Sequence, residues 1–276
     1  MTVSRARRSA VTRIAGSILA FALVAGCATP PPADDPEAVA EWEQVNDPLE
    51  PVNRAVFEFN RAADTYAIKP AAQGYRAVMP KFGRDRVHNV LSNLNSPLTF
   101  ANDVLQGEPD RAVQTLFRAM LNTSFGLLGY ADVAAEAGIP AHEEDFGQTL
   151  AVWGVGEGPF LMLPIFGPSN PRDTVGLVAE FFADPFDIAM GNMGREWISY
   201  TRGGMTGLDK RESLLDTLDE IERTSLDYYA SLRSLYRQHR ASEIKNGRGG
   251  PTKVLAPGLT GSAEPVRNDE LSQRAQ

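Results

Sequence analysis

The stretch from residue 154 to 173, GVGEGPFLMLPIFGPSNPRD, constrains the fold of this 276-residue chain more than any other. Its prolines remove backbone donors and fix φ, and its glycines permit unusual dihedrals, so an ordinary helix is excluded. Residues 160–166 are nevertheless almost entirely large and apolar, which is not typical of a solvated loop. Such a backbone is buried in protein, set against lipid, or lines a cavity. The residues alone leave open a buried core crossing and a lipid-contacting or cavity-lining role.

The N-terminus has the pattern of a bacterial lipoprotein signal peptide. Four arginines precede an apolar stretch from Ile14 to Ala25, which leads to Gly26 and Cys27. The order aliphatic, small, small, Cys is a lipobox, whose cysteine is acylated and becomes the mature N-terminus. We therefore predict a signal peptide at residues 1–26 and lipidation of Cys27, with a plain secretory signal as the alternative. Because Ala28 rather than Asp follows the cysteine, we expect an outer-membrane location.

Charge and cysteine content exclude several classes of function. Removal of residues 1–26 takes away four arginines and no acids, so the net charge of −8 becomes −12 (−8 − 4). A nucleic-acid partner is therefore not expected. Cys27 is the only cysteine, which leaves no residue for a disulfide or a thiolate metal site. No later segment has 18 or more uninterrupted apolar residues, so membrane attachment is expected to begin with the lipid.

Helical patterns dominate the rest of the chain and predict an all-α domain over residues 46–244. Asp47-Pro48-Leu49-Glu50 has the order of a capped helix start, and the first helix is expected to stop before Pro70. Ser96-Pro97 is expected to interrupt a second apolar stripe, and Asn170 to cap a helix that is apolar nearly all round. Residues 209–239 predict one long helix. Residues 27–45 are expected to form a flexible tether and residues 245–276 a disordered tail.

Enzymatic motifs are not found. Residues 154–158 lack the glycine spacing and the following helix of a dinucleotide site, and neither a nucleophile elbow nor a phosphate loop occurs. The histidines His88, His142 and His239 lie far apart and are expected at the surface. The acidic run at residues 143–145 is typical of a solvated helix start. We predict a protein that is not an enzyme and that has no catalytic residue, metal site or cofactor.

Many short motifs make the chain resemble the MlaA (VacJ) family of phospholipid-transport lipoproteins. The matching stretches are Asn46 to Glu50, Asn53-Arg54, Phe57 to Asn60, Asn89 to Leu94, Leu105 to Pro109, Phe146 to Leu150, Trp153 to Gly156, Gly158 to Phe160, Leu163-Pro164, Gly167 to Ser169, Arg172-Asp173, Asp227 to Tyr229 and Arg233 to Arg237. The resemblance spans residues 46–240, nearly all of the predicted folded region.

The resemblance implies a ring-like, monotopic helical protein embedded in the inner leaflet of the outer membrane. It implies a central channel through which phospholipid from the outer leaflet reaches a soluble periplasmic carrier, so that outer-membrane lipid asymmetry is maintained. The implied partners are phospholipid, the outer membrane, a porin trimer and a periplasmic carrier of the Mla type. It also implies a lipid-anchored protein on the periplasmic side of that membrane, with no hydrolytic step.

The 154–173 stretch then becomes a candidate channel wall and gate, whose glycines would allow movement. The candidates for the channel or gate are Pro159, Phe160, Leu161, Leu163, Pro164, Ile165, Phe166 and Gly167. The candidates for headgroup contact are Glu157, Arg172 and Asp173. The alternative function is a structural lipoprotein that tethers a partner at the outer membrane without moving lipid. A lipid-modifying hydrolase is disfavoured because a nucleophile constellation is missing.

Overall fold

Helices make up most of residues 47–246, the part of the chain that the computed structural model describes. The helices are α3 (Glu50–Ala63), a π-helical turn η2 (Asp64–Ile68), α4 (Lys69–Val78), α5 (Lys81–Leu105), α6 (Pro109–Ser124), α7 (Val133–Glu136), α8 (Phe146–Val152), α9 (Pro171–Ala183), α10 (Pro185–Asn192), α11 (Glu196–Ser213), α12 (Leu215–Thr224) and α13 (Tyr228–Ile244). Strands β1 (Leu161–Leu163) and β2 (Gly167–Ser169) form one antiparallel hairpin. The predicted all-α class is confirmed apart from this hairpin. Cys27, the predicted signal peptide and tether, and most of the predicted tail lie outside the described residues.

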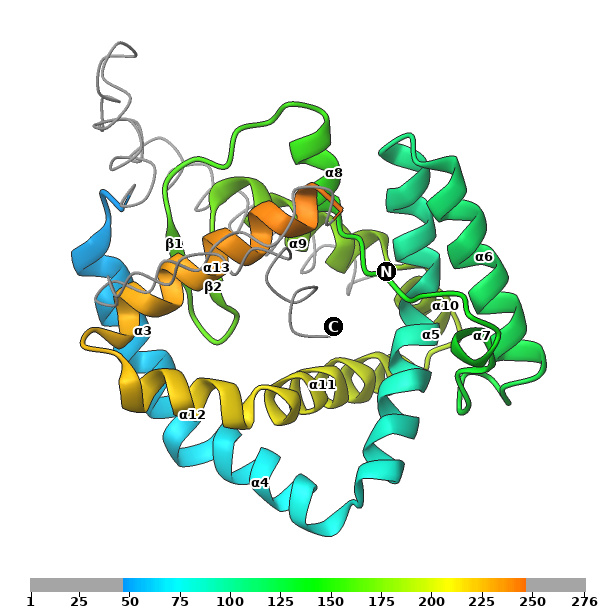
Figure 1. The fold of residues 1–276 in the computed structure, drawn as a ribbon, viewed down its shortest axis with the longest axis horizontal. Coiled ribbons are helices and arrows are strands. Elements are labelled where there is room, and N and C mark those ends of the chain that lie inside the picture. The colour runs from blue at the N-terminus through cyan, green and yellow to red at the C-terminus, as the bar shows by residue number, and fades with distance from the viewer. Residues whose placement is uncertain (1–46, 247–276) are drawn as a thin grey trace, which may run out of the picture.

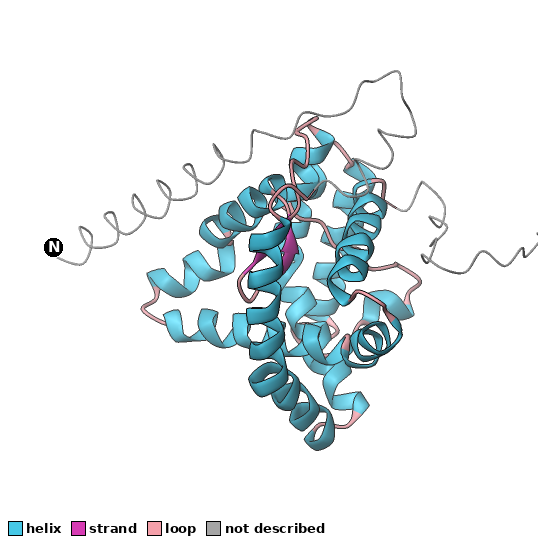
Figure 2. Ribbon diagram, turned by 90° about the vertical axis from the view of Figure 1, so that its left-hand side faces the viewer, coloured by secondary structure: helices cyan, strands magenta, loops and turns pink. Residues whose placement is uncertain are grey.

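The elements follow one another around a ring (Figure 1). α3 and α4 form one side, α5 and α6 pack against each other on the opposite side, and α11 with α12 runs between them. The hairpin, α8, α9 and α13 complete the remaining side, with α8 packed on α9. Figure 2 shows the hairpin lying among helices. The predicted ring-like helical architecture is therefore confirmed.

Apolar and polar side chains are distributed in an unusual way. Among residues 47–246, the buried set contains 8 hydrophobic residues and 17 polar or charged ones, while 32 large hydrophobic residues are exposed. A water-soluble domain of this size buries most of its large aliphatic and aromatic side chains. No helix in this part of the chain is both long and apolar enough to cross a membrane. Polar contacts thus hold much of the interior together, and much of the hydrophobic surface is exposed.

Two prolines in the first helices do not take the chain out of helical conformation. Pro70 lies in the first turn of α4, and the π-helical turn η2 joins α3 to α4 directly, so the chain passes the proline without leaving the helical region. Pro97 lies inside α5, which continues to Leu105 and packs along α6. α3 thus ends before Pro70, as predicted, although the chain stays helical through η2. The predicted interruption at Ser96-Pro97 is wrong, because tertiary packing overrides the local tendency of proline.

The predicted helix over residues 209–239 is also wrong, since the chain divides there into α11, α12 and α13. Ser225 is extended, with ψ of 139°, and ends α12. The Asp227 carboxylate then accepts a hydrogen bond from Ala230 N and begins α13. A capping aspartate inside a regular apolar pattern thus marks a new helix start.

Candidate functional site

The stretch that opened the sequence analysis is an ordered hairpin. Leu161 pairs with Ser169 and Leu163 with Gly167, and the turn between the strands contains Ile165 in the left-handed region, with φ of 68°. Ile165 is 57% exposed and Phe166, next to it at the tip, is 72% exposed. The hairpin therefore presents two large apolar side chains at its turn.

The base of the hairpin belongs to the hydrophobic core. Phe160 and Met162 are only 2% and 5% exposed. The Phe160 ring lies edge-on to Tyr229, with centroids 6.0 Å apart, and Tyr229 lies edge-on to Phe57 at 5.5 Å. Phe160 was expected to form part of a channel wall; it packs in the core instead, because alternation along β1 turns it and Met162 inward. Leu161 and Leu163, on the other face of β1, are half-buried.

Two asparagines of α3 hold the outer edge of β1. The Asn53 carboxamide donates from Nδ2 to Phe160 O at 3.0 Å and accepts at Oδ1 from Met162 N at 2.9 Å. The Asn60 carboxamide donates to Leu163 O at 2.8 Å and accepts from Ile165 N at 2.7 Å. The two residues are seven positions apart and so share one helical face. Each amide satisfies one N–H and one C=O of β1 or of the residues directly beside it, as a neighbouring strand would.

Asp47 joins this contact to the C-terminal helix α13. Its buried carboxylate accepts from Asn53 Nδ2 at 2.7 Å, from the Tyr229 hydroxyl, and from Arg233 Nη1 at 2.9 Å. Burial and the hydrogen bond to Asp47 raise the pKa of the Tyr229 phenol. Asp47 was predicted to cap α3, and this is wrong, since α3 begins at Glu50 without a side-chain cap. The carboxylate is used instead in a tertiary contact between α3 and α13.

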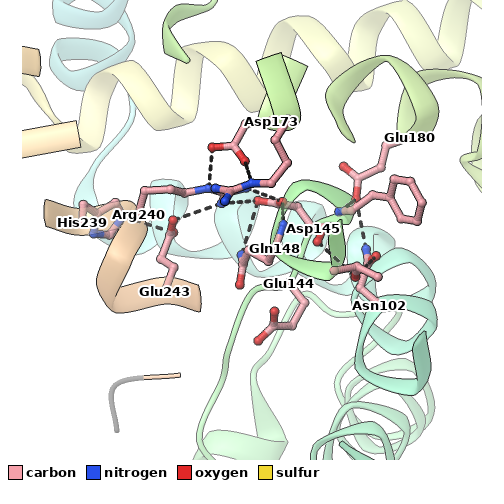
Figure 3. Close-up of polar contacts among 12 residues, drawn as sticks. Asn102, Glu144, Asp145, Gln148, Asp173, Glu180, His239, Arg240 and Glu243 are labelled. Carbon is pink, nitrogen blue, oxygen red and sulfur yellow. Dashed lines mark hydrogen bonds and ion pairs between the residues drawn. The ribbon is translucent and has the colours of Figure 1, made fainter. Parts of the chain in front are cut away.

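A second polar cluster, centred on Arg240 of α13, connects α13 to α8 and α9 (Figure 3). The guanidinium donates two hydrogen bonds of 2.6 Å to the Asp145 carboxylate and one of 2.8 Å to Asp173. Burial by itself would raise the pKa values of both carboxyls, but the hydrogen bonds and charge of Arg240 hold them below the usual range. Asp173 also accepts from Tyr236 at 2.6 Å and from Arg172 at 3.0 Å.

The three predicted headgroup residues are thus committed to contacts within the protein. Arg172 and Asp173 belong to the cluster around Arg240, and the Arg172 side chain is only 5% exposed. Glu157 forms an ion pair with Arg237 of α13. The predicted cap at Asn170 is confirmed, since its Oδ1 accepts from Asp173 N at 2.8 Å.

α8 and α9 approach closely at a pair of glycines. A Cβ added to Gly176 would lie 2.4 Å from Gly147 N, so only glycine fits there. Beside this contact, Glu180 Oε1 accepts from Phe146 N at 2.8 Å and from Asn102 Nδ2 at 3.0 Å (Figure 3). Burial raises the pKa of the Glu180 carboxyl.

A third cluster contains the histidine and acids that were expected at the surface. His142 Nε2 lies 3.0 Å from Asp103 Oδ1, and its side chain is only 11% exposed. Glu144 is buried and pairs with Arg111, and burial raises its pKa. The surface expectation is therefore wrong for both residues. Asp103 of α5 supplies a partner for His142, and Arg111 of α6 supplies a partner for Glu144. Within residues 47–246, no group of three or more His, Cys, Asp or Glu residues is arranged to hold a metal ion.

In two helices of the ring, the exposed residues are large and apolar and the buried residues are small or polar, which is the reverse of helices in soluble proteins. The exposed apolar residues of α6 are Val113, Leu116, Phe117 and Met120, and its buried residues are Ala112, Thr115 and Asn122. The exposed apolar residues of α9 are Val175, Leu177, Val178, Phe181 and Phe182, and its buried residues are Arg172 and Gly176. Large apolar side chains on an outward face match a lipid environment.

Sequence reasoning missed the residues that position the hairpin. Asn53 and Asn60 lie among apolar residues at helical spacing, where a polar side chain needs a specific partner. Their spacing of seven residues, which places both on one helical face, was the available signal. The strand that they contact could not be identified from this spacing. Arg240 pairs with three acids, of which Glu243 lies three residues on and Asp145 and Asp173 lie far away in the sequence, so the two distant partners could not be identified from local patterns.

The model of the MlaA lipoprotein family matches residues 45–243. The chain is 32% identical over 261 residues to the intermembrane phospholipid transport system lipoprotein MlaA of Escherichia coli K12, covering 93% of this chain and 96% of that protein. The corresponding Haemophilus influenzae protein is 31% identical, with 84% and 90% covered.

An uncharacterized protein of Rickettsia prowazekii is 34% identical over 203 residues, with 73% of this chain and 79% of that protein covered. A solved chain, from work on the structural basis for maintenance of bacterial outer membrane lipid asymmetry, superposes with a TM-score of 0.63 at 34% identity. The superposition covers 72% of this chain and 98% of that one. The chain therefore belongs to the MlaA lipoprotein family.

Proposed function

We propose that this chain is the lipoprotein of an intermembrane phospholipid transport system. In this proposal it removes phospholipid from the outer leaflet of the outer membrane and passes it through the helical ring to a periplasmic carrier. Outer-membrane lipid asymmetry is thereby maintained. The family membership and the names of the Escherichia coli and Haemophilus influenzae relatives support this function. No hydrolysis of lipid is part of the proposal.

The observation that carries the proposal is the inverted distribution of side chains. The outward apolar faces of α6 and α9 suit a ring surrounded by acyl chains, since hydrocarbon does not penalise exposed aliphatic and aromatic groups. The buried polar clusters suit a protein whose interior contacts need hydrogen bonds more than hydrophobic contacts. A ring of this kind can sit in one leaflet with no spanning helix.

The hairpin is proposed as a gate that contacts lipid with its tip. Ile165 and Phe166 are the exposed apolar residues there, and Pro164 and Gly167 shape the turn. The remaining gate candidates are Pro159, Leu161 and Leu163, which are half-buried along the hairpin and its approach. Because Phe160 and Met162 fix the base of the hairpin in the core, movement is confined to the turn between the strands.

Anchoring is proposed to occur through acylated Cys27 at the periplasmic side of the outer membrane. A porin trimer and a soluble periplasmic carrier of the Mla type are the proposed protein partners, on the basis of family membership. A multiply acylated cysteine anchors durably, since each buried acyl CH₂ contributes about 0.8 kcal/mol. The ring would then need only to position itself within the leaflet.

The test is a charged substitution at the tip of the hairpin. Phe166→Asp is expected to let phospholipid accumulate in the outer leaflet, measured by surface labelling of phosphatidylethanolamine with a membrane-impermeant amine reagent. Leu226→Asp is the matched control, since Leu226 is a fully exposed leucine away from the hairpin. If the Phe166→Asp protein is present at normal levels and surface phospholipid is unchanged, the proposed role of the hairpin as a gate is contradicted. Photocrosslinkers at Ile165 that capture only protein would favour a tethering lipoprotein instead.

A further inference from the structure

A cation held between two aromatic rings lies on the α5–α6 side of the ring, away from the hairpin. The Arg86 guanidinium carbon is 4.5 Å from the centroid of the Phe82 ring and 5.6 Å from that of the Tyr130 ring. The two rings lie edge to face with centroids 6.5 Å apart, and both side chains are exposed. We call these three residues the arginine clamp.

Arg86 is unusual among the arginines of residues 47–246 because it has no carboxylate partner in that part of the chain. Thirteen of the fifteen arginines within residues 47–246 form ion pairs, and the exceptions are Arg86 and Arg195. With respect to the described residues, the guanidinium of Arg86 makes one hydrogen bond, from Nη1 to Tyr130 O at 3.2 Å, and its Nε is buried without a partner. The neighbouring Asp85 pairs with Lys81 instead. The clamp therefore offers N–H donors and a positive charge to an external anion.

Directly before Tyr130, the chain displays three apolar side chains on a rigid loop. Phe125, Leu127 and Leu128 are 74%, 76% and 69% exposed. Both leucines have left-handed backbones, with φ of 53° and 61°, which a leucine rarely adopts unless the surroundings enforce it. The loop packs closely against α5 at Gly129, where an added Cβ would lie only 2.5 Å from Asn93 Cβ. The fold thus maintains a strained conformation that directs large apolar groups outward.

The loop and the end of α6 that leads into it contain no charged residue. Residues 119–131 include no Asp, Glu, Lys or Arg, and the loop continues the exposed apolar face of α6. A soluble anion would use the guanidinium but not the leucines, and a purely hydrophobic partner would leave the guanidinium without an anion. A phospholipid satisfies both, because it joins a phosphate to acyl chains. Aromatic side chains are also favoured at the boundary between headgroups and hydrocarbon.

We propose that the arginine clamp binds the phosphate of a membrane phospholipid while Phe125, Leu127 and Leu128 contact its acyl chains. This site goes beyond the proposed transport route, since it lies on the outside of the ring on α5 and the loop after α6. It fixes the depth and the tilt of that side of the ring in the leaflet. The chemical class of the ligand is a glycerophospholipid with an accessible phosphate.

The test uses the full acylated chain in vesicles of phosphatidylethanolamine and phosphatidylglycerol. A phospholipid with a diazirine in its acyl chain is expected to label residues 125–128. Arg86→Gln is expected to lower this labelling about tenfold, as for loss of a charge-assisted hydrogen bond. Arg195→Gln, which removes the other unpaired arginine, is the matched control and is expected to leave it unchanged.

Two further measurements do not depend on how Arg86→Gln folds. A diacylglycerol probe with the same diazirine chain but no phosphate is expected to label the unmodified protein about tenfold less than the phospholipid probe. The double variant Leu127→Asn, Leu128→Asn keeps residues that tolerate the left-handed region and is expected to lose labelling while it stays folded. Equal labelling by the two probes, or a photoreactive side chain at Leu128 that captures only protein, would overturn the proposal.

Discussion

Removal of the Asn60 carboxamide is expected to loosen the tip of the hairpin while the fold stays intact. Asn60→Ala deletes the hydrogen bonds to Leu163 O and Ile165 N, both close to the exposed turn. Water can replace the lost partners there, so each bond contributes its net value of about 0.5–1.5 kcal/mol. The free energy of opening the tip should therefore fall by about 1–3 kcal/mol, which corresponds to a rise of roughly 5-fold to 150-fold in exchange of the Ile165 amide hydrogen.

Asn53→Ala supplies the comparison, because the same carboxamide contact is buried there. Asn53 is 3% exposed and also donates to Asp47, so its loss leaves Phe160 O and Met162 N without partners in the core. Buried unsatisfied groups cost about 1–3 kcal/mol each, so global unfolding is expected to become easier by about 3 kcal/mol or more.

Amide exchange by mass spectrometry and denaturant unfolding in detergent separate the two effects. Asn60→Ala should change exchange near Ile165 with little change in the unfolding midpoint, and Asn53→Ala should change the midpoint. The reasoning fails if Asn60→Ala leaves exchange at the tip unchanged, or if both variants shift the midpoint equally.

Three further substitutions test the packing and the electrostatics of the ring, each by unfolding in detergent. Gly176→Ala places a Cβ 2.4 Å from Gly147 N and should cost about 1–3 kcal/mol, whereas Gly203→Ala, with no atom within 4 Å, should be neutral or stabilising. Phe160→Ala should cost about 3–5 kcal/mol, as for a large ring removed from a core. Arg240→Gln should cost about 3 kcal/mol at neutral pH, since it removes the cation that Asp145 and the buried Asp173 share.

The Arg240 substitution should also change how stability depends on pH. Arg240 holds the pKa values of Asp145 and Asp173 below the unfolded value of about 3.9, so their stabilisation is complete above that pH and is lost as pH falls through the folded pKa values. The free energy of unfolding should fall more steeply below about pH 4 in the unmodified protein than in Arg240→Gln. Equal slopes in that range would refute the assignment.

Local signals predicted much of the fold because they act over a few residues. The cap at Asn170 and the helix that follows it depend on contacts three positions apart, and both were predicted. Asp47 has the same local pattern but is drawn into a contact with Tyr229 and Arg233, more than 180 residues later. Local chemistry thus describes what a residue can do, and distant partners decide what it does.

The candidate site was harder to predict than the helices. Its residues were identified as one apolar stretch, but the alternation along β1 divides them into Phe160, which is buried, and Phe166, which is exposed. That division depends on the strand register, which follows from contacts with α3. The sequence showed how apolar the stretch is, and only the register shows which side chains remain free to meet lipid.

The small number of buried apolar residues has a calorimetric consequence. Unfolding raises the heat capacity mainly by exposing apolar surface to water, and globular domains show about 12–15 cal/mol/K per residue. Within residues 47–246, 8 hydrophobic residues are buried and 32 large ones are exposed to whatever surrounds the protein. If lipid or detergent covers these exposed hydrophobic residues before and after unfolding, they add little to the heat-capacity change of unfolding. The unfolding heat capacity per residue should therefore lie below the globular range, so that stability varies less steeply with temperature than in a water-soluble domain of equal length.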